Sequence, residues 1–102
     1  MTQALFVGSG AFGEPTLKAL AASRQCVGVV TATDKKAGRK QQLTPTPIGI
    51  CAEALGLPCI KTDNINTEPS IHDFEFDTMV VIAFGQKLSG DLIERYDAVN
   101  LH

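Results

Sequence analysis

The sequence predicts a doubly wound α/β fold around a mostly parallel, Rossmann-like sheet. Short apolar runs recur along the chain, as expected for strands that are buried on both faces of a sheet. Segments with helical spacing of apolar residues lie between most of these runs, and parallel strands need such crossover connections. The chain has 102 residues, which is short for a complete fold of this class, so we expect one domain that is incomplete at its C-terminus. The five apolar runs are residues 4–8, 26–32, 58–60, 78–84 and 98–102.

The first 32 residues follow the order strand, helix, strand. ALFVG (4–8) is apolar throughout and ends in glycine. Residues 15–22 place their apolar side chains on one helical stripe, and Pro15 suits a first helical turn because its missing N–H costs nothing there. CVGVVTA (26–32) is a second buried strand. This pattern predicts a parallel βαβ unit.

The middle of the chain is more polar. Residues 33–46 combine glycine, proline and charge without apolar periodicity, so we expect a long loop of the kind that often carries function. A helix is predicted over 47–56, followed by a short strand at 58–60. Residues 61–76 are largely polar and irregular, with one helical turn near 69–72.

The last part of the chain contains its strongest strand. Residues 78–84 form a near-continuous apolar run rich in β-branched side chains. A short amphipathic helix is predicted around 89–96, with Ser89 as its N-cap and with Leu92 and Ile93 facing the core. A final strand follows this helix.

Composition describes an ordinary globular protein, with 44% hydrophobic and 20% charged residues. The net charge of -2 argues against a surface that coats nucleic acid in general, although it allows a local basic patch. No signal peptide and no apolar run of ~20 residues is found, so we expect a cytoplasmic protein without membrane contact. Cys26, Cys51 and Cys59 lie among apolar neighbours and are interpreted as small buried hydrophobes. No residue cluster has the spacing of metal ligands, so no metal is expected.

Residues 8–13 spell G-x-G-x-x-G between the first strand and the first helix. In dinucleotide-binding proteins such glycines make a tight turn, admit the pyrophosphate and allow close helix packing. Asp34 lies near the position of a ribose-binding acid. Against this hypothesis, Asp34 opens a basic loop, and Glu14 puts a carboxylate where a pyrophosphate needs positive potential. A dinucleotide site and a plain βα turn both stay open on this motif alone.

Three longer segments carry a more specific resemblance. Residues 31–58 contain A-G-R and L-x-P-x-P, residues 80–88 contain F-G-Q-x-L after a strand, and residues 98–102 contain N-x-H. In order and spacing they resemble the N-terminal half of the methionyl-tRNA formyltransferase family, and the resemblance covers essentially the whole chain. It implies the formyltransferase fold, with residues 1–102 as the N-terminal part of a catalytic domain and no second domain.

The resemblance also changes the interpretation of the glycine motif. The family usually has G-T-P-x-F-A after its first strand, and residues 8–13 stand in its place. The three-glycine spacing is then accidental. Gly8 would be needed for the turn and Phe12 would lie near the active-site cleft, whereas Gly13 would matter little.

The resemblance implies catalytic roles for Asn100 and His102, which match the N-x-H pair. Strand alternation projects both from one face at the carboxyl edge of the last strand, where parallel sheets bind ligands. An amide N–H and an imidazole there would stabilise the oxyanion that forms when an amine attacks a formyl carbon. The aspartate that completes the family's site has no match in this chain. Without the resemblance, these are two polar residues at a strand end.

A folate site is implied for the segment that follows the strongest strand. Its backbone would read the pterin edge, and Gly85 would allow close approach. From the residues alone, a plain connection with a surface lysine is the better interpretation. Phe84 replaces the family's more common tyrosine, which puts any contact of that hydroxyl in doubt. The implied cofactor-binding residues are Phe84, Gly85, Gln86, Lys87, Leu88 and Leu92.

Four cations fall within residues 35–40, the one basic cluster of the chain. Most charge runs are solvated loops. The resemblance implies contact with the tRNA acceptor stem, with Arg39 matching the family's key arginine, Gly38 allowing the loop to order on binding, and phosphates as the partners. The implied substrate-binding residues are Phe12, Lys35, Lys36, Arg39 and Lys40.

These implications give one leading hypothesis and two alternatives. The leading one is an enzyme of translation initiation that transfers a formyl group from 10-formyltetrahydrofolate to the amino group of initiator methionyl-tRNA, without metal, and as a monomer when full length. We expect this 102-residue chain alone to be inactive. The alternatives are another folate-dependent formyltransferase or hydrolase acting on a small amine or on water, and a dinucleotide-binding Rossmann module.

Overall fold

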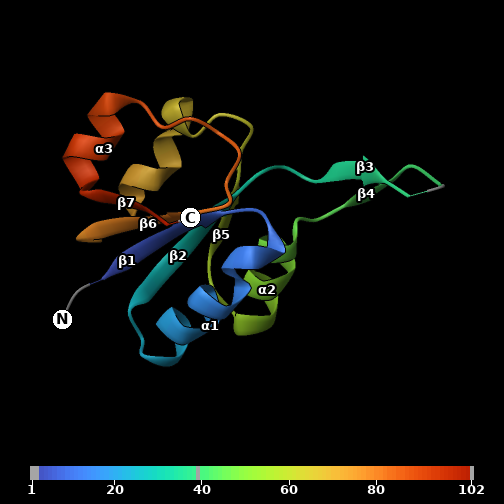
Figure 1. The fold of residues 1–102 in the computed structure, drawn as a ribbon, viewed down its shortest axis with the longest axis horizontal. Helices are drawn as coiled ribbons and strands as arrows, with labels where there is room; N and C mark the ends of the chain where they lie inside the picture. Colours follow the sequence, from blue (N-terminus) through green and yellow to red (C-terminus); the bar gives the residue numbers. More distant parts are fainter. Residues whose placement is uncertain (1–2, 39, 102) are drawn as a thin grey trace.

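A five-stranded parallel sheet with strand order β5-β2-β1-β6-β7 organises the computed structural model, which describes residues 3–38 and 40–101 (Figure 1). A separate antiparallel hairpin, β3–β4, lies outside this sheet. The strands are β1 (Ala4–Gly8), β2 (Cys26–Thr31), β3 (Lys35–Ala37), β4 (Gln42–Thr44), β5 (Cys59–Lys61), β6 (Thr78–Ile82) and β7 (Ala98–Leu101). The helices are η1 (Ala11–Gly13), α1 (Glu14–Ala22), α2 (Pro47–Leu55), η2 (Ile65–Thr67), η3 (Pro69–Asp73) and α3 (Gly90–Tyr96), where η marks a 3₁₀-helix.

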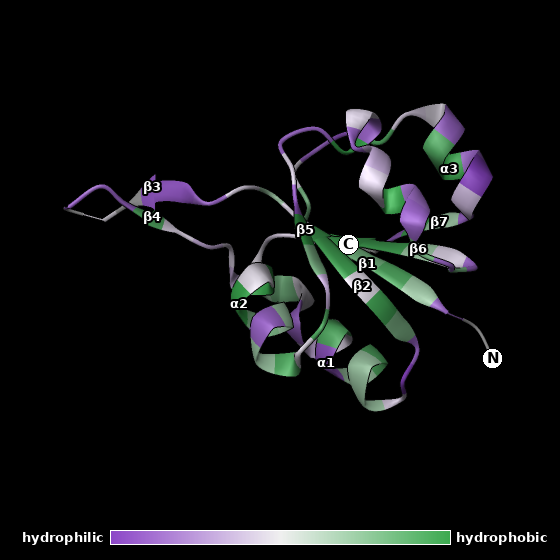
Figure 2. Ribbon diagram, turned by 180° about the vertical axis from the view of Figure 1, so that it is seen from behind, coloured by the Kyte–Doolittle hydropathy of each residue, from purple (hydrophilic) through white to green (hydrophobic). Residues whose placement is uncertain are grey.

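Helices cover both faces of the sheet, which confirms the predicted doubly wound α/β class. The helices η1, α1 and α2 lie on one face, whereas η2, η3 and α3 lie on the other (Figure 1). The strands of the main sheet are mostly hydrophobic along their length, whereas the helices combine hydrophobic and hydrophilic residues (Figure 2). Each face has its own core: Phe6, Leu17, Val29, Ile48 and Ile82 are among the residues of the first, and Leu5, Val30, Ile65, Met79 and Leu92 among those of the second.

The strand order reverses between β1 and β6. The chain builds outward from β1 through β2 to β5, and it then returns to place β6 on the other side of β1. Adjacent loops at such a reversal diverge to opposite faces of the sheet and open a crevice at the carboxyl ends of the strands. This is the place where the fold positions a ligand site.

Local signals define the ends of the predicted helices well. The hydroxyl of Ser89 accepts a hydrogen bond from the N–H of Leu92, as predicted for an N-cap. Thr46 caps α2 in the same way by accepting from Gly49, and Gly56 ends α2 in the left-handed conformation.

Residues 33–46 were expected to form a long loop, and this prediction is wrong. Lys35–Ala37 and Gln42–Thr44 pair as an antiparallel hairpin, in which Lys36 lies opposite Leu43. Gly38 takes a left-handed φ of 77° and lies in the turn between the strands. The hairpin projects from the body of the molecule (Figure 1) and its β4 strand is exposed, so it has no apolar face that a sequence pattern could reveal.

Two other predictions need correction at the edges of the sheet. Cys59 is exposed rather than buried, because β5 is an edge strand. The strand expected over 78–84 ends at Ile82, since Ala83 takes a φ of 49° and Gly85 a φ of 84°, both outside the range of a strand.

Gly13 matters more to the packing than the sequence indicated. A β-carbon on Gly13 would lie 2.9 Å from the ring of Phe6, which is fully buried between the sheet and the helices. The turn at Gly8 is tighter still, because a β-carbon there would lie 2.5 Å from the carbonyl oxygen of Ile82. Gly8 and Gly13 therefore serve close packing of the βα turn around one aromatic ring.

Candidate active site

Two adjoining cavities lie beside β6 and β7, next to the segment that connects β6 to α3. One has a volume of about 330 Å³ and the other about 280 Å³. Both are lined by Val81, Gln86 and Asn100, so they form neighbouring parts of one depression at the edge of the sheet. The first is also lined by Lys87, Leu88, Ile93 and Ala98, and the second also by Phe12, Ala83, Phe84 and Gly85.

Asn100 lies where the two cavities meet. It is paired in register with Val81 of β6, and residues paired in this way on parallel strands project from the same face. The side chain of Asn100 is exposed, so its amide is open to a ligand. His102, the other residue predicted to be catalytic, lies outside the described residues.

The segment 84–88, predicted to bind a folate, lines both cavities. Phe84 and Gly85 border the smaller one and Lys87 and Leu88 the larger one, with Gln86 between them. Leu92 lies elsewhere than expected: it is packed into the core, and the larger cavity is lined instead by Ile93, which is 47% exposed. The wall on the α3 side is therefore one residue away from the predicted position.

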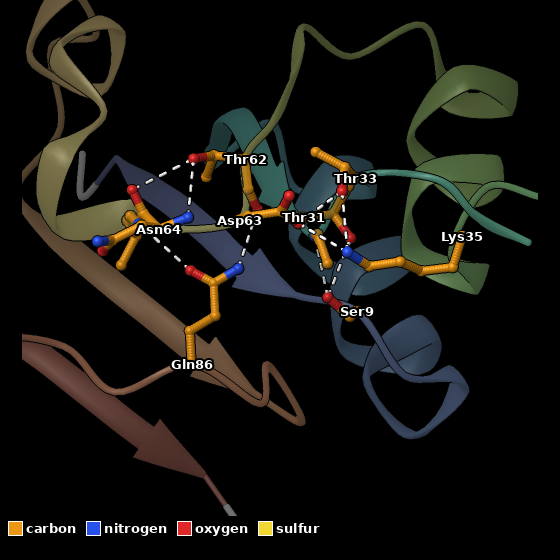
Figure 3. Close-up of polar contacts among 10 residues, drawn as sticks. Ser9, Thr31, Thr33, Lys35, Thr62, Asp63, Asn64 and Gln86 are labelled. Carbon is orange, nitrogen blue, oxygen red and sulfur yellow. Dashed lines mark hydrogen bonds and ion pairs between the residues drawn. The ribbon is translucent and has the colours of Figure 1, made fainter.

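Gln86 does not offer its side-chain amide to the cavity. Its Nε2 donates to the carbonyl oxygen of Thr62 (2.9 Å), and its Oε1 accepts from the N–H of Ile65 (2.9 Å). Figure 3 shows this amide lying against the segment that leads from β5. The N–H of Ile65 belongs to a fully buried residue, so Gln86 supplies a partner that water cannot replace. A ligand at this wall would meet backbone groups and neighbouring side chains rather than the amide of Gln86.

The loop after β1 is joined to the loop after β6 through its backbone. The N–H groups of Ser9 and Gly10 both donate to the carbonyl oxygen of Ala83, each at 3.1 Å. In a dinucleotide site such N–H groups would face the pyrophosphate. Asp34, the candidate ribose-binding acid, instead forms an ion pair with Lys61 at 2.7 Å. These contacts disfavour the dinucleotide interpretation.

Small hydroxyl side chains hold the base of the glycine turn. Ser9 Oγ accepts from the N–H of Ala32 (3.1 Å) and from the hydroxyl of Thr31 (3.3 Å), and Thr31 in turn lies 2.6 Å from the hydroxyl of Thr46 (Figure 3). Thr31 is fully buried, so these bonds are what allows a polar side chain there. This series of hydrogen bonds was not predicted from the sequence. Thr46 before Pro47 was its one readable signal, as a typical helix N-cap.

The predicted tRNA-binding residues divide into two groups. Phe12 is 70% exposed and borders the smaller cavity. Lys36 and Lys40 are exposed in the projecting hairpin and its turn, whereas Arg39 lies outside the described residues. Lys36 and Lys40 are thus carried on the hairpin that projects away from the sheet (Figure 1).

Lys35 is held at the base of the hairpin instead of pointing freely into solvent. Its Nζ lies 2.8 Å from Asp63 Oδ1 and 3.1 Å from the hydroxyl of Thr33, and Thr33 also donates to Asp63 at 2.5 Å (Figure 3). The hydrogen bonds from Lys35 and Thr33 lower the pKa of Asp63. Lys35 therefore ties the hairpin to the segment after β5.

Comparison with known proteins assigns the family. No protein-family model matches the chain. The methionyl-tRNA formyltransferase of Listeria innocua is 36% identical over 107 residues, an alignment that covers 100% of this chain. Those of Halothermothrix orenii and Synechococcus sp. strain CC9902 are each 40% identical, over 96% and 89% of this chain.

The chain belongs to the methionyl-tRNA formyltransferase family. It spans about a third of the length of these relatives, namely 34% of the Listeria protein, 33% of the Halothermothrix protein and 28% of the Synechococcus protein. The resemblance deduced from A-G-R, F-G-Q-x-L and N-x-H is thereby confirmed. None of the helices in the described part of the chain has the length and apolar character that a membrane crossing requires.

The cysteines of this formyltransferase family member show no sign of an activated thiol. Partial burial raises the pKa of Cys26, and it also raises the pKa of Cys59 although nearby Lys61 opposes the shift. A raised pKa lowers the fraction of nucleophilic thiolate at neutral pH. Among residues 3–38 and 40–101, no group of three or more His, Cys, Asp or Glu side chains is placed to hold a metal ion.

Proposed function

We propose that this chain forms part of the catalytic domain of a methionyl-tRNA formyltransferase, which transfers a formyl group from 10-formyltetrahydrofolate to the amino group of methionine on initiator tRNA. The observation that supports this most is that Asn100 and the segment 84–88 border the same two cavities. These segments carry two of the three family motifs, and their joint position around the two cavities supports a common ligand site beside the sheet reversal. The tRNA substrate implies action in the cytoplasm.

The proposed reaction moves one acyl group between two nitrogens. The α-amine attacks the formyl carbon, a new C–N bond forms, and the bond from that carbon to N10 of the folate breaks. The amine loses a proton and N10 gains one. Negative charge develops on the formyl oxygen in between, and the exposed amide of Asn100 is available to donate to it. His102, on the same strand alternation, would supply the second donor. Each well-placed donor of this kind is worth about 3–4 kcal/mol.

The cavities suit a ligand with a flat ring and an extended tail. Small-molecule sites usually enclose about 300–1,000 Å³. Neither cavity alone exceeds about 330 Å³, but the two adjoin at Asn100 and together fall well inside that range. Leu88, Ile93 and Ala98 give the larger one an apolar wall, which fits the face of a pterin ring. The reacting formyl group would then lie near Asn100.

The hairpin is proposed as the tRNA contact. Its projecting arm carries Lys36 and Lys40, and each phosphate that such cations neutralise adds salt-dependent affinity. Arg39 lies between them in the sequence and is proposed to take part. Lys35 takes a different role, because its ammonium already has Asp63 and Thr33 as partners. We propose that it sets the direction of the arm.

A thermal-shift comparison tests the ligand class. We expect 5-formyltetrahydrofolate, a stable analogue of the proposed donor, to raise the melting temperature, and NAD⁺ to have no effect. Asn100→Ala should reduce the shift only slightly if Asn100 acts mainly on the transition state. Stabilisation by NAD⁺ alone would reject the formyltransferase proposal in favour of a dinucleotide site.

Filter binding of initiator tRNA at several salt concentrations tests the arm. Arg39→Ala and the pair Lys36→Ala/Lys40→Ala should weaken tRNA binding and reduce its salt dependence, while the folate shift stays unchanged. Equal loss of both ligands would contradict the role given to the hairpin. Binding of folate without any binding of tRNA would favour the alternative of a formyltransferase or hydrolase for a small substrate.

We further propose that the 102-residue chain does not transfer formyl groups on its own, because the carboxylate that the family resemblance requires beside His102 has no match in it. Turnover by the isolated chain, followed by formyl transfer to charged initiator tRNA, would refute this.

A further inference from the structure

The cavity wall formed by residues 86–89 has no regular secondary structure of its own. It connects the end of β6 to the start of α3. Its contacts come from the segment 62–66, which follows β5 and includes η2. Gln86 anchors the wall at one end through Thr62 and Ile65, as described above.

Asn66 makes the contacts at the other end of the wall. Its Nδ2 donates to the carbonyl oxygen of Lys87 at 2.9 Å, and its Oδ1 accepts from the N–H of Ser89 at 2.8 Å. The two groups of one short planar amide thus fix two peptide units on either side of Leu88. Leu88 lines the larger cavity between these two fixed points.

The position of Asn66 is itself well determined. The N–H of Asn66 donates to the side chain of Asn64 at 3.0 Å, and the neighbouring Ile65 is fully buried in the core. Asn66 is exposed, so its amide is not needed to satisfy a buried group in the core. Because Asn66 is fixed next to the buried Ile65, its side-chain amide can hold the wall 86–89 in a defined position relative to the core.

Ser89 extends the effect of Asn66 to the opposite side of the cavity. Ser89 is the N-cap of α3, and Ile93 on that helix also lines the larger cavity. Fixing the N–H of Ser89 therefore fixes where α3 begins. The contact with Ser89 therefore contributes to the placement of both Leu88 and Ile93.

We propose that Asn66 is a positioning residue for ligand binding: it holds the wall 86–89 in the conformation that receives the ligand. The ligand, a folate, rests on the proposed function, whereas the effect of Asn66 on the wall does not. Without the amide, the wall would have to be ordered by the ligand itself, and affinity would fall by the cost of that ordering.

Backbone amide exchange measured by NMR on the 102-residue chain tests the effect on the wall. In Asn66→Ala the N–H of Ser89 loses its partner, and we expect its exchange to accelerate by about tenfold or more. Asn66→Asp keeps the acceptor for Ser89 and removes the donor to Lys87, so the Ser89 amide should stay protected. Thr67→Ala is the matched control, because it removes a hydrogen bond to Asn64 in the same turn and touches no residue of the wall.

Titration with 5-formyltetrahydrofolate tests the effect on binding. We expect the dissociation constant to rise about fivefold to tenfold in Asn66→Ala, by less in Asn66→Asp, and to stay unchanged in Thr67→Ala. A purely structural role would instead lower stability to urea equally in Asn66→Ala and Thr67→Ala without separating their affinities.

Each outcome decides the proposal. Unchanged exchange at Ser89 in Asn66→Ala, or faster exchange with unchanged affinity, would overturn it. If Asn66→Ala does not fold, Asn66→Asp decides, and affinity equal to that of the unmodified chain would overturn it. Failure of the unmodified chain to bind 5-formyltetrahydrofolate would overturn the proposed function, and the exchange at Ser89 would then decide the role of Asn66 alone.

Discussion

Replacing Gly13 with alanine is expected to destabilise the protein, although the sequence gives alanine every local advantage there. Gly13 has φ −84° and ψ −8°, a conformation that alanine adopts freely. At such positions Gly→Ala usually stabilises by about 0.4–1 kcal/mol, because the unfolded chain loses conformational freedom. The added β-carbon, however, would lie 2.9 Å from Cζ of Phe6.

The clash at Phe6 cannot be relieved cheaply. Cζ lies on the rotation axis of the ring, so turning the ring about that axis does not move it. The ring is fully buried and also borders the space beside Gly8, where its nearest carbon would be 2.9 Å from an added β-carbon. Ile82 and Ile48 lie 3.4 and 3.5 Å from the new methyl group. Overpacking of this kind costs about 1–3 kcal/mol.

Urea unfolding followed by circular dichroism measures the balance, with Gly90→Ala as the matched control. Gly90 lies in α3, and among the described residues a β-carbon added there would meet no neighbouring atom within 4 Å, so alanine should stabilise the chain. We expect Gly13→Ala to unfold with a free energy about 1–3 kcal/mol below that of Gly90→Ala.

A double variant tests the cause. In a Phe6→Leu background the distal ring carbon is gone, so Gly13→Ala should cost less there, with a coupling of about 0.5–3 kcal/mol. A Gly13→Ala variant as stable as Gly90→Ala, or full additivity with Phe6→Leu, would refute the reasoning.

Three further outcomes are expected. Gln86→Ala should lower the free energy of unfolding by about 2–4 kcal/mol in urea, because it removes two hydrogen bonds and leaves a buried N–H without its partner; a loss below about 0.5 kcal/mol would contradict this. Lys35→Met should raise the pKa of Asp63 toward 3.8 in an NMR titration. Because folding lowers the pKa of Asp63, its contact with Lys35 stabilises the folded chain above pH 3.8, and this stabilisation is lost as the pH falls through the folded pKa. An unchanged pKa of Asp63 in Lys35→Met would show that Lys35 does not cause the shift. A thiol reagent at pH 8 should label Cys59 first in the folded chain, and Cys59→Ser should remove that fast phase; persistence of the phase would place the reactive thiol elsewhere.

The main sheet was predictable because its signals are local. Each buried strand is a continuous apolar run, and β1, β2 and β6 each have both faces covered by other elements. The ends of helices were equally predictable where one side chain caps its own helix, as Ser89 does for α3. The β3–β4 hairpin was missed because it lacks such a local signal: an exposed strand with no buried face has no alternation of apolar and polar residues.

The candidate site was predictable in part. Family motifs pointed to Asn100 and to the segment 84–88, and the fold brings these together at two cavities. The structure packs Leu92 into the core and places Ile93 at the larger cavity, because the rotation of a short helix depends on what packs beneath it. The role of Lys35 also changed once its partner Asp63, 28 residues along the chain, was known.

By itself, the sequence determined the fold class, the order of the strands of the main sheet and the motifs that belong to the family, since apolar runs, caps and short motifs are all local. The tertiary structure decided which groups meet. Gln86 contacts residues 21 and 24 positions away, and Asn66 contacts residues 21 and 23 positions away. Gly13, at the end of η1, is constrained by the ring of Phe6 on β1. Such contacts arise only when the sheet brings distant segments together, because hydrogen bonds and close packing depend on distance in space and leave no period in the sequence.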